Sequence, residues 1–219
     1  MIHLNHLTKT FVLRGQRKTV ARDIEAVFPT GAVVGLLGRN GAGKTTLMQM
    51  IAGTMEPTSG RILSDGSISY PVGFAGSFHR DLTGAQNTRF VARIYGIDTE
   101  ALVAFVEDFA ELGKHYHLPF RTYSAGMRAR LAFGVSMGIP FDFYLIDEVT
   151  AVGDANFREK SREVFLDRMR SSGALFCSHS LPQVKELCDM GAVLENGTLT
   201  LFDDVEEAIA CHVSNMGKG

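Results

Sequence analysis

The most informative segment of the sequence is Gly38-Arg39-Asn40-Gly41-Ala42-Gly43-Lys44-Thr45, which fits the pattern G-x-x-x-x-G-K-[S/T] at every fixed position. It follows the apolar run 32–37, which has the composition of a strand buried on both faces. A helix is predicted directly after the loop, reaching about Ala52. A buried strand, a glycine-rich loop and a helix in this order are the context that the motif requires.

The residue types of this loop suit a polyphosphate. The glycines let backbone N–H groups turn inward around the anion, and the helix presents its positive N-terminal end to it. Lys44 supplies a cation for the β- and γ-phosphates, and the Thr45 hydroxyl can ligate Mg²⁺. A glycine-rich turn without a ligand is the alternative, and the flanking strand and helix argue against it. The predicted nucleotide contacts are Gly38, Arg39, Asn40, Gly41, Ala42, Gly43, Lys44, Thr45 and Thr46.

Two further strands end in polar residues that suit phosphate chemistry. The apolar segment 141–146 is followed by Asp147 and Glu148, and His179 follows the segment 174–178. Ligands of a doubly wound sheet bind beyond the carboxyl ends of its strands. Asp147 is therefore expected to hold Mg²⁺ through its water shell, and Glu148 to orient and deprotonate the attacking water. His179 is expected to reach the γ-phosphate; a satisfied surface or core histidine is the alternative.

A second helix start can also bind an anion. Tyr123-Ser124-Ala125-Gly126-Met127 precedes a predicted helix that runs to about Met137, so its first N–H groups and the Ser124 hydroxyl form an anion site. The alternative is a plain N-cap, which Ser124 would also satisfy. One domain has no obvious use for a second phosphate site, whereas each copy in a head-to-tail dimer could offer it to the ATP of its partner.

Composition bounds the class of protein. The 219 residues carry 22 Lys and Arg against 24 Asp and Glu, a net charge of −2, so no nucleic-acid partner is expected. The three cysteines, Cys177, Cys188 and Cys211, form no C-x-x-C pair and are interpreted as reduced thiols. Neither a signal peptide nor an apolar run of membrane-spanning length is found, so we expect the chain to stay in the cytosol and to reach a membrane only by docking onto another protein.

The order of elements predicts an α/β fold. Strands alternate with helices at both ends of the chain, which indicates a mostly parallel core sheet with an N-terminal antiparallel β part. The middle section, 83–138, reads as an inserted helical lobe. In it Phe90, Val91, Ile94 and Tyr95 form a helical-period stripe that is interpreted as lobe core. We therefore predict one domain, 1–219, with a nucleotide-binding core lobe at 1–82 and 139–219.

In combination, these motifs resemble the ABC ATPase family, a type of P-loop NTPase, over almost the whole chain. They match its Walker A, signature, Walker B and switch-histidine motifs in the right order. By position the resemblance also implies that Phe11 stacks on adenine, that Asp154 is the D-loop aspartate and that His79 replaces the Q-loop glutamine. The implied catalytic residues are Glu148, His179 and His79, the metal contacts Thr45, Asp147 and His79, and the further ATP contacts Phe11, Ser124, Gly126 and Asp154.

Within that family the chain is most similar to the ATPases of capsular-polysaccharide exporters. The stretches that carry this similarity are 70–78, 81–84 and 147–160. Many O-antigen ATPases carry an added C-terminal domain, and an end at Gly219 favours the capsule type. The resemblance implies an ATPase at the cytoplasmic face of the inner membrane, a head-to-tail homodimer on two copies of a transmembrane permease, and periplasmic and outer-membrane export proteins reached through that permease.

Four other functions compete with this one. The ATPase of an O-antigen or teichoic-acid exporter is the nearest, and an importer or drug-exporter ATPase fits the 147–160 stretch less well. Non-transport ABC proteins usually carry two cassettes or long coiled coil, neither of which is found here. A metabolic P-loop kinase would leave the segment 123–127 without a purpose.

Overall fold

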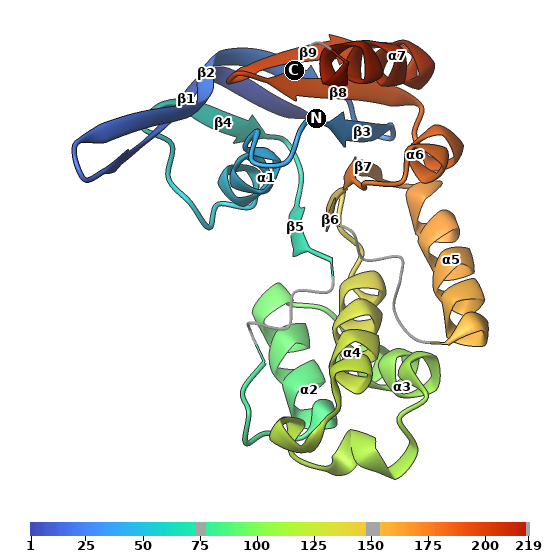
Figure 1. Ribbon diagram of the computed structural model, residues 1–219. Coiled ribbons are helices and arrows are strands. Elements are labelled where there is room, and N and C mark those ends of the chain that lie inside the picture. Colours follow the sequence, from blue (N-terminus) through green and yellow to red (C-terminus); the bar gives the residue numbers. More distant parts are fainter. Residues whose placement is uncertain (73–77, 148–153, 218–219) are drawn as a thin grey trace. The chain divides into compact units, whose positions relative to one another are not determined.

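The computed structural model describes residues 1–72, 78–147 and 154–217 (Figure 1). The chain divides into two compact units. The first, called the sheet unit here, comprises Met1–Pro71, Phe141–Glu148 and Met169–Gly219. The second, the helical unit, comprises Val72–Pro140 and Val149–Arg168. The lobe boundaries predicted at 83 and 138 stay predictions.

A six-stranded sheet organises the sheet unit. Its strand order is β5-β6-β7-β3-β8-β9, and every pairing is parallel except that of β8 with β9. The pair Asn196-Gly197 predicts a hairpin from the sequence, and its positive φ angles of 49° and 85° between the antiparallel strands β8 and β9 confirm it. The strands are β3 (Val33–Leu37), β5 (Ile68–Pro71), β6 (Phe143–Asp147), β7 (Gly173–Cys177), β8 (Met190–Glu195) and β9 (Thr198–Phe202).

A three-stranded antiparallel sheet, ordered β2-β1-β4, forms the N-terminal part of the same unit. It comprises β1 (Ile2–Leu13), β2 (Gln16–Phe28) and β4 (Ser59–Ser64). The apolar pattern of the sequence predicts a second strand only over 24–28, and this prediction is wrong. Arg14 and Gly15 turn the chain with φ angles of 50° and 80°, so β2 already begins at Gln16 and pairs Phe11 with Lys18. The polar pattern of 16–23 hid this strand because its side chains are largely exposed.

One hydrophobic core joins the two sheets. Ile2, Leu4 and Phe28 of the antiparallel sheet are fully buried with Leu36 of β3 and Leu145 of β6. Helix α1 (Lys44–Ile51) adds Leu47, Met48, Met50 and Ile51 to this core. The loop before α1 is thus anchored at both ends, by a buried strand and by a helix whose apolar residues are packed.

Two more helices complete the sheet unit, α6 (Leu181–Leu187) and α7 (Val205–Met216). Helix α7 lies close to β8, as Figure 1 shows at its red end. A Cβ atom on Gly191 of β8 would lie 2.1 Å from the Cβ of Ala208, so only glycine permits this approach. The close approach brings His212 and Met216 of α7 to the cavity beneath the loop 38–43.

The helical unit contains α2 (Gly84–Tyr95), α3 (Thr99–Ala110), α4 (Ala125–Gly138) and α5 (Ala155–Met169), with short 3₁₀ turns at Gly113–His117 and Phe120–Thr122. Val91 of the predicted apolar stripe is buried, but Phe90 and Ile94 are 51% and 63% exposed. Their assignment to the lobe core was therefore wrong. Among the described residues no helix is long and apolar enough to cross a membrane. The predicted α/β arrangement, with a mostly parallel sheet, an antiparallel part and a group of helices, is confirmed.

Candidate nucleotide-binding site

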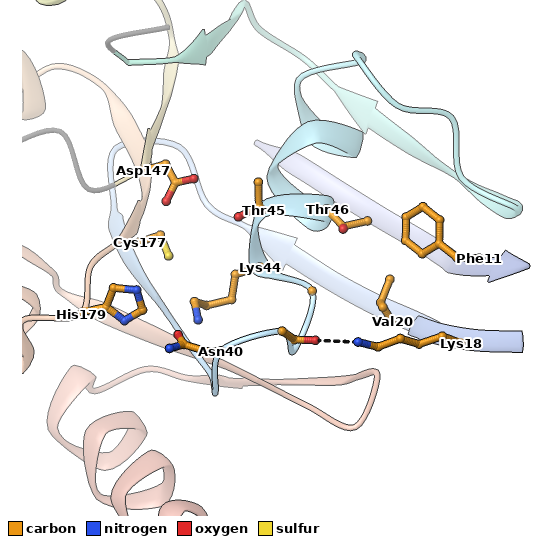
Figure 2. Close-up of a pocket in the computed structure, with 12 residues that line it drawn as sticks. Phe11, Lys18, Val20, Asn40, Lys44, Thr45, Thr46, Asp147, Cys177 and His179 are labelled. Carbon is orange, nitrogen blue, oxygen red and sulfur yellow. Dashed lines mark hydrogen bonds between the residues drawn. The ribbon is translucent and has the colours of Figure 1, made fainter. Parts of the chain in front are cut away.

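A cavity of about 440 Å³ lies where the loop 38–45 meets the carboxyl ends of β6 and β7 (Figure 2). In Figure 2 the side chains of Lys44, Asp147 and His179 surround a common space. The lining residues are Phe11, Lys18, Val20, Asn40, Gly41, Gly43, Lys44, Thr45, Thr46, Asp147, Cys177 and His179. Residues that the sequence predicted from separate motifs are thus brought together within the sheet unit.

The backbone of the loop leaves the start of α1 open. Gly43 caps the helix with φ 112° and provides no side-chain hydrogen bond, so no side chain occupies the helix start. A Cβ on Gly43 would lie 3.0 Å from the Cβ of Val20, and one on Gly38 would lie 2.5 Å from the Leu194 carbonyl oxygen. Glycine at these two positions lets the loop pack closely while its N–H groups stay available for an anion.

Lys44 is held within its own loop. Its Nζ donates hydrogen bonds to the carbonyl oxygens of Gly38 at 2.6 Å and Arg39 at 3.3 Å. These bonds keep the ammonium group at the cavity. There it can donate to phosphate oxygens in addition to the two carbonyl oxygens, or in place of them. Lys18 of β2 donates to the Gly41 carbonyl at 3.5 Å, which places a second cation at the same loop (Figure 2).

Parallel pairing brings the polar strand ends to the loop. Asp147, the last residue of β6, is in register with Cys177, the last residue of β7, and His179 follows two residues later. Thr45 and Asp147 line the same cavity, so a hydroxyl and a carboxylate oxygen face one space. Mg²⁺ usually takes one or two protein oxygens and completes its shell with water and substrate phosphates, and this pair of oxygens fits that need.

The β1–β2 hairpin forms the end of the cavity at which adenine is predicted to bind. Phe11, predicted by resemblance, lines the cavity and is 39% exposed, which leaves its ring available to stack on a base. Three lining residues were missed from the sequence: Lys18, Val20 and Cys177. Lys18 could have been found once β2 was extended, since it pairs with Phe11 across the hairpin. Cys177 is buried at the end of β7, two residues before His179, and Val20 lies behind Gly43.

The predicted signature segment forms a separate cavity in the helical unit. Ser124 and Gly126 line a space of about 290 Å³, together with Glu111, His115 and Arg130. The Ser124 hydroxyl accepts a hydrogen bond from the Met127 N–H at 3.2 Å and thus caps α4. Both interpretations of Ser124 therefore remain open here: it is an N-cap, and it stands at a helix start that lines a cavity.

Arg130 joins this cavity to the residue predicted as the D-loop aspartate. Its guanidinium donates to Asp154 at 2.8 Å and lies 4.3 Å from the ring centre of Phe157. Asp154 also accepts the Phe157 N–H, and that bond, followed by the nearby Arg130 charge, holds the pKa of its carboxyl below the usual range. Asp154 is therefore held as a charged group beside α4.

His79 belongs to a tightly bonded loop of the helical unit. The buried Asn87 side chain accepts the His79 N–H at 2.8 Å and donates to the His79 carbonyl at 3.1 Å. The ring Nδ1 accepts the Asp81 N–H at 3.3 Å. Since a backbone N–H can only donate, the neutral ring carries its proton on Nε2. The metal-ligand role of His79 stays a prediction, and it would require this arrangement to change.

Some predicted residues fall elsewhere. Gly38 and Arg39 line a second cavity, described below, and Ala42 lies within the loop itself. Glu148, the predicted general base, lies outside the described residues. The stretch 73–77, which contributed to the capsule-type resemblance, also lies outside them.

Comparison with known proteins gives the family. The sequence model described as ABC transporter matches residues 21–151, more than half of the chain. The chain belongs to the ABC transporter family. Its fold matches a member of that family described as a dimeric post-hydrolysis state of the ATP-binding cassette MJ0796 bound to ADP and Pi, with a TM-score of 0.77 at 18% identity over 91% of this chain and 96% of that one.

Relatives within the family differ in how similar they are to this chain. The polysialic acid transport ATP-binding protein KpsT of Escherichia coli is 46% identical over 95% of both chains. The capsule polysaccharide export ATP-binding protein CtrD of Neisseria meningitidis serogroup B is 43% identical over 95% of this chain and 96% of its own. The O-antigen export protein RfbB of Klebsiella pneumoniae is 34% identical over 94% of this chain and 85% of its own. The resemblance predicted from the sequence, capsule type before O-antigen type, is confirmed.

Proposed function

We propose that this chain is the ATP-hydrolysing subunit of a capsular-polysaccharide exporter. The observation that carries the proposal is 46% identity, over 95% of both chains, to a polysialic acid transport ATP-binding protein. The cavity formed by the loop 38–45 with Asp147 and His179 supplies the chemistry that such a role requires. The chain would work at the cytoplasmic face of the inner membrane, held there by a transmembrane permease.

The sheet unit binds and positions ATP. Phe11 stacks on adenine, the N–H groups of the loop and α1 surround the phosphates, and Lys44 exchanges its carbonyl partners for phosphate oxygens. Thr45 and Asp147 would hold Mg²⁺, which when bound neutralises the charge of the β- and γ-phosphates. His179 donates to the γ-phosphate, and Glu148 accepts a proton from the attacking water. Positioning and electrostatics then supply most of the rate acceleration.

The helical unit completes the site of a second copy. In a head-to-tail dimer, Ser124 and Gly126 of one chain would face the γ-phosphate that is bound to the loop of its partner. Asp154, fixed by Arg130, would accompany this segment because the ion pair ties it to α4. Two MgATP molecules would thereby be enclosed between two chains, and hydrolysis would reopen the dimer.

The permease is proposed to dock beside α2. Phe90 and Ile94 project one turn apart from this helix and are more than half exposed, which suits an apolar contact. Asn87, on the same helix, clamps the backbone of His79, so the His79 loop moves with the first turn of α2. A displacement of the His79 loop would then move α2 and, with it, the docking surface formed by Phe90 and Ile94.

O-antigen export is the alternative. The relatives named for it are 33–37% identical, against 42–46% for those named for capsule or polysialic acid transport, and this difference favours the capsule type. A relative named for teichoic-acid export is 37% identical over 85% of this chain and is also more distant than the capsule-type relatives.

The experiment is ATP hydrolysis and polysaccharide export by the chain co-expressed with its permease, for wild type, Glu148→Gln and the exposed control Glu207→Gln. Loss of a positioned general base should lower turnover by about 10²–10⁴-fold while ATP binding persists. The control should behave as wild type. Near-normal hydrolysis by Glu148→Gln would remove Glu148 from the mechanism. The transport function would be rejected if the wild-type chain hydrolyses ATP normally but a strain that lacks the chain still exports normal amounts of surface polysaccharide.

A further inference from the structure

A second cavity adjoins the nucleotide site within the sheet unit. It has a volume of about 310 Å³ and shares Asn40, Lys44 and His179 with the first cavity. Its other walls come from Gly38 and Arg39 of the loop and from Leu36 and Leu37 of β3, and α7 closes it with His212 and Met216. The two cavities therefore meet at the residues proposed to contact the γ-phosphate.

The charge of this second cavity favours an anion. Among the described residues that line it, Arg39 and Lys44 are cationic, Asn40 offers a side-chain amide, and the Ser178 hydroxyl is engaged by Gln183 at 3.2 Å. Two imidazoles, of His179 and His212, complete the polar lining, and the described lining residues include no carboxylate. Its volume lies at the lower end of the range for ligand pockets, which suits a small ion with its water molecules better than a second nucleotide.

His212 is unusual among the groups at this cavity because it is buried without a full set of partners. It is 8% exposed, and its buried Nδ1 has no hydrogen-bond partner among the described residues. Within the same described part of the chain, the buried Oε2 of Glu195, the last residue of β8, has no partner either. Such orphaned polar groups are costly, and native proteins usually retain them for a reason.

The charges around His212 explain how it could respond to an anion. Burial comes first and lowers the pKa of the imidazole, the nearby Lys44 ammonium lowers it further, and the Glu195 carboxylate raises it. Arg39 and His179 also border the cavity, so the Arg39 guanidinium adds positive charge on the loop side of His212, and the Glu195 carboxylate opposes it. An incoming anion would add negative charge and favour the protonated ring.

We propose that this second cavity is a binding site for inorganic phosphate, which the product occupies after it leaves ADP, and that His212 with Glu195 is its receptor. The proposal rests on the proposed ATP hydrolysis. Hydrolysis near neutral pH yields ADP, hydrogen phosphate and a proton. His212 accepts that proton and becomes an imidazolium with two N–H donors. Nδ1–H then donates to the free oxygen of Glu195, and Nε2–H donates to a phosphate oxygen.

This assignment gives α7 a function in the reaction cycle. The phosphate ion moves from the nucleotide cavity, past Lys44 and His179, into the second cavity beside His212. The separation of phosphate from ADP therefore does not require the nucleotide cavity to open. Substitution of His212 should therefore affect phosphate and leave ADP binding intact, whereas loss of Lys44 should affect both.

The test is titration of inorganic phosphate into the Mg·ADP-bound full-length chain, followed by the imidazole ¹⁵N signals and by isothermal calorimetry. Wild type should bind phosphate with a shift of the His212 resonance to the protonated form. His212→Phe should weaken phosphate binding roughly tenfold or more, because a charge-assisted bond is lost, and should leave ADP affinity unchanged. The matched control His6→Phe, at an exposed histidine of the β1 strand paired with Asp23, should bind phosphate as wild type does.

Glu195→Gln is the second variant, since it keeps the side-chain size and does not add an apolar ring. It should also weaken phosphate binding and should prevent protonation of His212 on phosphate addition. Unchanged phosphate affinity in both variants, or a His212 resonance that ignores phosphate, would overturn the proposal while leaving ATP hydrolysis standing. Failure of wild type to bind Mg·ADP would instead reject the proposed function on which it rests.

Discussion

The starts of α1 and α4 are both candidate anion sites, yet they are built differently. Gly43 leaves the start of α1 without a side-chain cap, whereas Ser124 caps α4 by accepting the Met127 N–H at 3.2 Å. Lys44 stands beside the α1 start, and at the α4 start Arg130 is engaged by Asp154 at 2.8 Å. The α1 start is thus ready to bind an anion in a single chain, while the α4 start is satisfied internally.

This difference predicts which of the two helix starts should bind ATP first. An uncapped helix start with a nearby ammonium group gains most from a polyphosphate, because its N–H groups have no other partner. A capped start gains less from an anion and therefore needs one that is already positioned. The α1 site is expected to load ATP in the monomer, and the α4 site to engage that ATP afterwards from the partner chain.

Lys44→Ala is expected to have the largest effect on the α1 site. Removal of the ammonium group leaves the phosphates without their charged side-chain partner, so ATP affinity of the monomer should fall roughly tenfold or more. Lys18→Ala, which removes the second cation of the same cavity, should have a smaller effect because Lys18 lies nearer the β1–β2 hairpin. Fluorescent ATP-analogue titration measures both. Equal losses for the two variants would show that net charge, and not the loop geometry, determines affinity.

Ser124→Ala isolates the capping role at the α4 start. Loss of an N-cap typically costs about 1 kcal/mol of stability, so the urea midpoint should fall accordingly. Ser136→Ala is the matched control: the Ser136 hydroxyl, in the last turn of the same helix and away from the N-cap, donates to the Ala132 carbonyl, and its removal should change stability less. A Ser124→Ala variant as stable as wild type would contradict the internally satisfied α4 start.

The smallest expected effect is a pH-dependent one at Asp154. The Phe157 N–H and then Arg130 hold its pKa below the usual range. A depressed folded pKa contributes stability above the unfolded value, near 3.9, and this contribution is lost as the pH falls through the folded value. Asp154→Asn should therefore lower the urea midpoint slightly at pH 7, and this deficit should shrink as the pH falls below the unfolded value and through the lowered folded pKa. The exposed Asp203→Asn serves as control, and an Asp154→Asn deficit independent of pH would contradict this assignment.

Sequence reasoning succeeded where the signal is local. The glycines of the loop 38–45 predict its conformation directly from the sequence. Asp147 and His179 were predicted as site residues because each lies at or just after the end of an apolar strand. Sequence reasoning missed Lys18 because the β2 strand is too exposed to show an apolar pattern and its position depends on pairing with β1. The burial of His212 could not be predicted from the sequence either, because it depends on the close approach of α7 to β8 at Gly191 and Ala208. The exposure of Phe90 and Ile94 reflects tertiary packing that a helical stripe alone cannot indicate.

The α1 start is proposed to load ATP and the α4 start to engage that ATP from the partner chain, and this requires the two helix starts to meet across a dimer. Ser124→Arg places a long cation at the α4 start and should prevent it from approaching a bound phosphate. A chain with this substitution should still load ATP, because its α1 site is unchanged. Lys44→Ala has the reverse defect, with an intact α4 start and an impaired α1 site. Each variant alone should therefore lack ATP-dependent dimerisation and hydrolysis.

The most direct measurement is ATP hydrolysis, with dimer formation followed by light scattering, in a one-to-one mixture of Lys44→Ala and Ser124→Arg chains. A head-to-tail dimer of the two contains one composite site with an intact α1 start and an intact α4 start. Its other site combines both defects, and there the introduced arginine faces a loop that holds no ATP. The mixture should thus form a dimer on ATP addition and regain hydrolysis that neither variant shows alone. A mixture that stays monomeric and inactive, although Ser124→Arg binds ATP normally, would contradict the assignment of the two helix starts to one shared site.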